Sequence, residues 1–108
     1  MSVYDFFVMM FYSLDHAFQK SPNEELRLYL SDLDPFIWAD ECSADPAEYE
    51  DLKSDFQKHG TTDAYGYVFV KDHIDRKCSG TIKAAFSTIS KSAWKRAMKE
   101  YLRRKPTA

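Results

Sequence analysis

The chain has 108 residues, of which 44% are hydrophobic and 30% are charged. This length suffices for one hydrophobic core and the composition excludes a disordered chain, so we expect a single helical domain over residues 1–108. Three glycines and four prolines are too few for the frequent tight turns of a many-stranded β fold.

The N-terminal segment, residues 2–19, predicts an amphipathic helix with bulky apolar side chains. Its apolar positions recur at helical spacing: Val3, Phe6, Phe7, Met10, Leu14 and Phe18. The continuous apolar run at 6–11 is too short to span a bilayer, and no basic residue precedes it. We therefore expect neither a membrane anchor nor a signal peptide, and the chain is predicted to be cytoplasmic.

Three dipeptides combine a side-chain acceptor with a proline, which is typical of helix starts because the first helical N–H needs no partner. They are Ser21-Pro22, Asp34-Pro35 and Asp45-Pro46. The first and third predict helices over 22–32 and 46–58. After the second, we expect a short turn whose apolar residues plug into the core: Phe36, Ile37 and Trp38.

Residues 64–77 fit either a strand or a helix, because they are rich in β-forming residues and contain Gly66. A helix is favoured because no other segment offers a partner strand, and Thr62 or Asp63 would cap it. Ser79-Gly80 then breaks the chain before a long final helix over 81–104, with a hinge near 87–92 as an alternative. The predicted fold class is all-α, a compact bundle of five or six helices.

Charge is the least random feature of the sequence. Residues 1–60 contain four basic and thirteen acidic side chains, whereas residues 61–108 contain eleven basic and four acidic ones. The acidic side chains concentrate in residues 40–55 and the basic ones in residues 91–105. Such a split indicates surfaces for charged partners, unless the two regions neutralise each other within the fold or complement helix dipoles.

The leading hypothesis is a small, non-enzymatic protein-binding module of bacterial type, such as an adaptor, an inhibitor or an immunity-like protein. Exposed aromatic side chains bordered by acids are typical of protein interfaces. The residues predicted to bind the partner protein are Trp38, Asp40, Glu41, Glu48, Glu50 and Asp51.

The alternative hypothesis is nucleic-acid binding by a basic ridge on the last helix, which would follow a phosphate backbone. Its residues are Lys91, Lys95, Arg96, Lys99, Arg103 and Arg104. The negative net charge and the lack of a nucleic-acid-binding motif make this the weaker hypothesis. A homodimer in which acidic and basic surfaces meet is a third.

No catalytic, metal or cofactor site is expected. The acidic segment lacks the glycine of a calcium loop, and the chain has no Glu-x-x-His pair for a di-iron centre. His73 is predicted to be an ordinary surface or boundary residue, because the adjacent Asp72 faces another way on a helix. Cys42 and Cys78 are predicted to be reduced thiols, with a single disulfide as the alternative.

Overall fold

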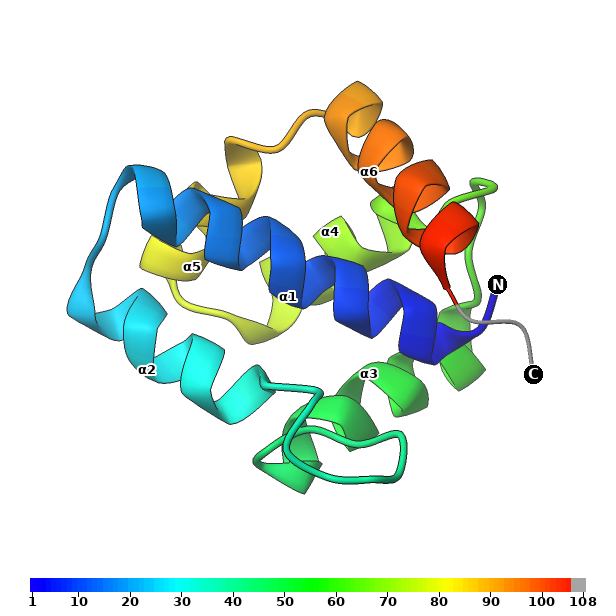
Figure 1. The fold of residues 1–108 in the computed structure, drawn as a ribbon, viewed down its shortest axis with the longest axis horizontal. Coiled ribbons are helices and arrows are strands. Elements are labelled where there is room, and N and C mark those ends of the chain that lie inside the picture. The colour runs from blue at the N-terminus through cyan, green and yellow to red at the C-terminus, as the bar shows by residue number, and fades with distance from the viewer. Residues whose placement is uncertain (106–108) are drawn as a thin grey trace.

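The computed structural model describes residues 1–105, which form six α-helices and no strand (Figure 1). The helices are α1 (Val3–Lys20), α2 (Glu24–Leu33), α3 (Pro46–His59), α4 (Tyr67–Lys77), α5 (Gly80–Ser87) and α6 (Lys91–Arg104). All six contribute side chains to one buried hydrophobic cluster. These observations confirm the predicted all-α bundle of five or six helices. Within the same residues, no helix has both the length and the apolar character needed to cross a membrane.

Helix α1 lies at the centre of the bundle, and each of the other five helices contacts it (Figure 1). From Phe6 to Met10 every residue is at most 2% exposed. A helix that is apolar all round must be enclosed by other elements, and this run explains why the bundle is organised around α1. Burial of each such side chain contributes roughly 1.5–3 kcal/mol to stability.

Of the three predicted cap dipeptides, only Asp45-Pro46 starts a helix. Helix α2 instead begins after Asn23, whose side chain accepts a hydrogen bond from the N–H of Leu26. Ser21 and Asp34 are the C-terminal caps of α1 and α2, and their N–H groups donate to the carbonyls of the preceding helices. The prediction for Ser21 was wrong because this residue completes the helix before it. Asp34 ends α2 and also accepts a hydrogen bond from the N–H of Phe36 at 2.9 Å, in the turn expected after Pro35.

Residues 64–77 are helical from Tyr67 onward, as favoured from the sequence. Asp63 caps this helix, because its carboxylate accepts hydrogen bonds from the N–H groups of Tyr67 at 2.9 Å and Val68 at 3.3 Å. Gly66 precedes the helix with φ of 74°, and a Cβ placed on it would lie 2.6 Å from the ring of Phe6. The glycine that weakened the helix prediction therefore permits both the turn and the close packing at its start.

The predicted final helix over 81–104 is in fact two helices, and the break falls where a hinge was the alternative. Helix α5 ends at Ser87, and Ser90 caps α6 by accepting from the N–H of Ala93. The hydroxyls of Ser87 and Thr88 also donate to carbonyls three residues back. Hydroxyl side chains that bond to their local backbone compete with helix continuation, which accounts for the break.

Residues 34–45 form the irregular loop between α2 and α3, seen at the lower edge of Figure 1. Phe36, Ile37 and Trp38 are 56%, 58% and 52% exposed, so the prediction that they plug into the core was wrong. At the start of this loop the buried residues are Leu33 and Pro35 instead, and side chains from the helices form the core.

Candidate functional site

The α2–α3 loop presents its three large apolar side chains from an anchored backbone. The indole N–H of Trp38 donates to the carbonyl of Ser43 at 2.9 Å, and the hydroxyl of Tyr4 donates to the carbonyl of Pro35 at 3.0 Å. Ser43 is fully buried and its hydroxyl accepts from the N–H of Tyr49 on α3. The loop is therefore fixed at both ends by bonds to itself and to the neighbouring helices.

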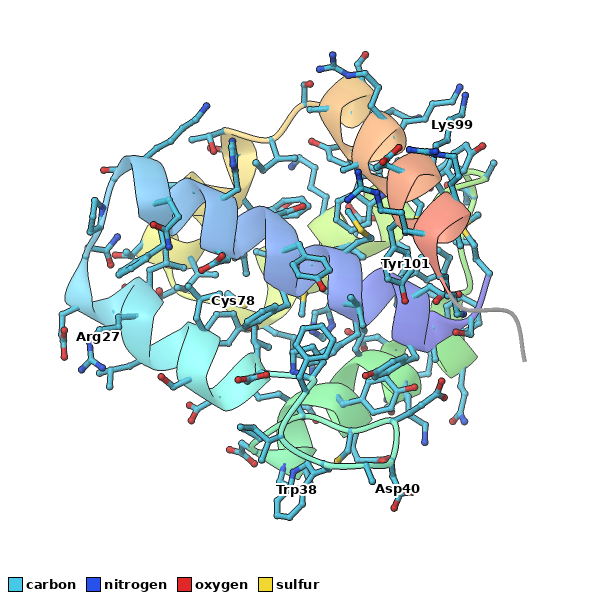
Figure 2. All side chains as sticks on the ribbon, in the orientation of Figure 1. Arg27, Trp38, Asp40, Cys78, Lys99 and Tyr101 are labelled. Atoms are coloured by element: carbon cyan, nitrogen blue, oxygen red, sulfur yellow. The ribbon has the colours of Figure 1, made fainter. Side chains whose placement is uncertain are left out.

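The structure divides the predicted acidic surface between two sides of α3. Asp40 and Glu41 are exposed on the loop with Trp38, and Figure 2 shows Trp38 and Asp40 together at the lower edge. Burial, followed by the charges of Glu41 and Glu50, raises the pKa of Tyr49 to about 12.

Glu48 and Asp51 lie on the other side of α3, where they line a pocket formed with α2 and α4. Burial raises the pKa of Glu48, and the nearby carboxylates of Asp45, Asp32 and Asp51 raise it further. The carboxyl oxygens of Asp32, Asp45 and Glu48 lie within 4.8 Å of one another, close enough to share a cation. A cluster of acids alone does not define a metal centre.

An aromatic groove continues from the loop toward α6. The ring of Phe36 lies 6.0 Å from that of Phe11 and 5.8 Å from that of Tyr12. The adjoining groove has a volume of about 520 Å³ and runs past Tyr12 to Glu100 and Tyr101. Phe36 and Ile37 were not predicted to be surface residues. The signal that could have indicated it is their position after Pro35, outside any helical periodicity.

The predicted basic ridge is only partly free of counter-charges. Glu100 pairs with both Arg103 and Arg104, at 2.6 Å and 2.7 Å. Within residues 1–105, no acidic side chain lies within ion-pair distance of Lys91, Lys95, Arg96 or Lys99. Lys95 and Lys99 both lie over the ring of Tyr65, about 6 Å from its centroid.

The α2–α3 loop with its acidic residues and the basic ridge of α6 lie far apart, with Asp40 and Lys99 at opposite ends of the view in Figure 2. In the described residues, two contacts join the acidic half to Lys or Arg of the basic half. Asp5 bonds to Lys105 at 2.8 Å and Asp55 to Arg76 at 3.3 Å. Neutralisation within the fold therefore leaves both predicted surfaces charged.

His73 is 2% exposed, so the prediction of a surface or boundary histidine was wrong. Its Nδ1 lies 2.5 Å from Oδ2 of Asp55, which also contacts Arg76. Burial would raise the pKa of Asp55, but the hydrogen bonds from His73 and Arg76 outweigh burial and lower it. Burial lowers the pKa of His73 despite the opposing effect of Asp55. The pair is thus an ionised carboxylate that accepts from a neutral imidazole.

No sequence signal predicted this pair, because its members are 18 residues apart on different helices. Cys42 and Cys78 are both free thiols, as predicted. The thiol of Cys78 lies 3.2 Å from the hydroxyl of Tyr29, and burial raises the pKa of both groups.

No known family model matches the chain, and no curated protein or solved structure is significantly similar to it.

Proposed function

We propose that this chain is a non-enzymatic protein-binding module that uses the α2–α3 loop as its contact surface. Phe36, Ile37 and Trp38 form the centre of this surface, and Asp40 and Glu41 form its rim. The observation that supports it is a run of three large apolar side chains, each more than half exposed, on a hydrogen-bonded loop. The chain would then act as an adaptor, an inhibitor or an immunity-like protein for its partner.

Physical chemistry favours this assignment over an accidental patch. Exposing contiguous large apolar side chains to water is unfavourable, and such patches mark sites that a partner covers. An aromatic centre with a charged rim is the common composition of protein interfaces. Because the loop is already ordered, binding would cost less conformational entropy than folding a mobile segment.

The charge of the rim defines the chemistry of the partner. Asp40 and Glu41 are exposed, and in the described structure neither forms an ion pair. We therefore expect an apolar depression bordered by lysine or arginine on the partner. Complementary charges at an interface rim speed association and fix orientation, and salt weakens them.

The test of the apolar centre is quantitative capture from lysate of the cells that naturally express the chain. We expect the double substitution Phe36→Ser and Ile37→Ser to reduce one captured protein by at least about tenfold, because central interface side chains dominate binding. Leu28→Ser is the matched control, since Leu28 is 53% exposed on α2, away from the loop. Equal capture by both variants would reject the loop as the contact surface.

The test of the rim uses Asp40→Lys with Glu41→Lys, measured at low and high salt. We expect weaker capture at low salt and a smaller salt dependence, because rim charges act mainly through long-range attraction. Asp72→Lys on α4 is the control, since Asp72 is exposed on a different helix. An unchanged salt dependence in the double variant would remove the rim from the proposal.

Nucleic-acid binding by α6 is a second candidate, favoured by one observation. Lys91, Lys95 and Lys99 lie on α6 with no acidic partner within ion-pair distance in the described residues, and Tyr65 lies beneath two of them. Fluorescence polarisation with duplex and single-stranded oligonucleotides tests it. Binding that weakens steeply with salt, and that is lost in Lys95→Glu with Lys99→Glu, would support this candidate. Absence of binding at low salt would remove it.

A further inference from the structure

Several hydrogen-bond acceptors surround a pocket of about 340 Å³ between α2, α3 and α4. Four carboxylates line it, two from α2 and two from α3, against a single lysine from α4. They are Glu25, Asp32, Glu48 and Asp51, and the lysine is Lys77. Figure 2 shows Cys78, which also lines the pocket, on the side of the molecule away from Lys99. The pocket is therefore separate from the basic ridge.

The buried His73 gives this pocket an acceptor with a defined orientation. Its Nδ1 is bonded to Asp55, which does not line the pocket, whereas His73 itself does. In the described residues Nε2 has no hydrogen-bond partner, although every fully buried side-chain nitrogen or oxygen has one. Nε2 is therefore not fully buried, and His73 is one of the residues that line the pocket. Burial lowers the pKa of His73 and so favours the neutral ring. In a neutral ring whose Nδ1 donates its proton to Asp55, Nε2 carries the lone pair.

We propose that this pocket binds a guanidinium group, with Glu48 and Asp51 accepting its charged hydrogen bonds and Nε2 of His73 accepting a further one. Glu48 and Asp51 are three residues apart, so they share one face of α3. A guanidinium offers five N–H donors in a planar fork, which suits several separated acceptors.

The spacing of the acceptors argues against a single metal ion. In the described structure, the only group of three or more such residues whose ligand atoms all lie within 4.8 Å of one another is Asp32, Asp45 and Glu48. Neither His73 nor Cys78 belongs to that group, so the donor atoms around the pocket do not converge on one point. Burial keeps the thiol of Cys78 neutral by raising its pKa, which leaves the four carboxylates and Lys77 as the charged groups that line the pocket.

The proposal does not depend on the α2–α3 loop as a protein-binding surface. The guanidinium could belong to a free small molecule or to an arginine side chain of another protein, and the two sources require different probes. Butylguanidinium represents the free ligand, and N-acetylarginine methylamide represents the side chain. Butylurea has a similar shape without the charge, so it is the negative probe.

The experiment is an NMR titration of the full chain with these three probes, which records amide shifts and the ring nitrogens of His73. We expect saturable shifts at the pocket residues and at Nε2 of His73 with one or both guanidinium probes, and none with butylurea. The stronger of the two guanidinium probes identifies the source. Equal binding of butylurea, or shifts that stay linear and spread over the molecule, would overturn the proposal.

Matched variants test the acceptors. We expect Glu48→Gln with Asp51→Asn to weaken binding by at least about tenfold, because hydrogen bonds to ionised acceptors are roughly twice as strong as neutral ones. Asp40→Asn with Glu41→Gln removes the same charge from the loop and should leave the affinity unchanged. Equal weakening in both pairs would show that only net charge matters and would also overturn the proposal. Circular dichroism of each variant verifies that it remains folded.

Discussion

Nδ1 of His73 donates a hydrogen bond to Oδ2 of Asp55, and this contact joins α4 to α3 inside the bundle. Arg76 contacts the same oxygen from the surface at 3.3 Å. The carboxylate therefore orients the imidazole of His73, which lines the pocket, so this one contact links the packing of two helices to the proposed ligand site.

Replacing Asp55 by Ala removes the acceptor of a buried donor. We expect the free energy of unfolding to fall by about 1–3 kcal/mol, which is the usual cost of leaving a buried polar group unsatisfied. Asp51→Ala on the same helix is the control, since Asp51 is exposed, and it should change stability by no more than about 0.5 kcal/mol. Urea unfolding measures both, and similar losses would contradict a special role for Asp55.

Stability should decrease in mildly acidic solution because of His73. Burial lowers its pKa in the folded protein, so protons bind more readily to the unfolded chain, whose histidines titrate near about 6.5. The contribution of neutral His73 to the free energy of unfolding is complete above that pH and is lost as the pH falls below it. Asp55 acts in the same direction at lower pH, since its pKa is lowered too.

Urea unfolding across a series of pH values checks this dependence. A variant carrying His16→Gln and His59→Gln isolates His73, because these are the other histidines of the chain. The free energy of unfolding of this variant should still be lower at lower pH. Stability that rises on acidification would contradict this prediction.

The three glycines provide a graded test of backbone strain. Gly66→Ala should destabilise most, by at least about 1–3 kcal/mol, because φ is positive and the new Cβ would lie 2.6 Å from Phe6. Gly60→Ala should cost less, since its φ is also positive but the surrounding space is open. Gly80→Ala meets neither obstacle and should be neutral or slightly stabilising. Thermal unfolding ranks them, and any other order would contradict the structure.

Tyr101 connects the last helix to the first. Its hydroxyl donates to Oδ1 of the buried Asp5 at 2.9 Å, and Lys105 contacts the same oxygen. Tyr101→Phe should therefore lower the free energy of unfolding by about 1 kcal/mol, the typical net contribution of a hydrogen bond. Tyr12→Phe is the control, because Tyr12 is exposed and its hydroxyl has no bond in the described structure. Equal effects would show that this hydroxyl does not stabilise the bundle.

Local chemistry in the sequence was enough to predict the fold class and several helix ends. Apolar spacing predicted α1, and Asp45-Pro46 predicted the start of α3, because helical periodicity and capping involve residues three or four apart. The same local rule failed at Ser21, since a residue in a short connection can complete one helix or begin the next. Only the chain path decides between these roles.

The candidate sites depended on tertiary structure. Charge and aromatic content identified Glu48, Asp51 and Trp38, but they could not show that Trp38 lies on the loop surface while the two acids face a pocket. Nor could they pair Asp55 with His73, because exposure and contact between helices are set by how distant segments pack. The sequence by itself determined that this chain forms a helical bundle with charged, aromatic surfaces. Only the packing of α2, α3 and α4 decided which of those charges share a site, because side chains far apart in the chain meet only when their helices do.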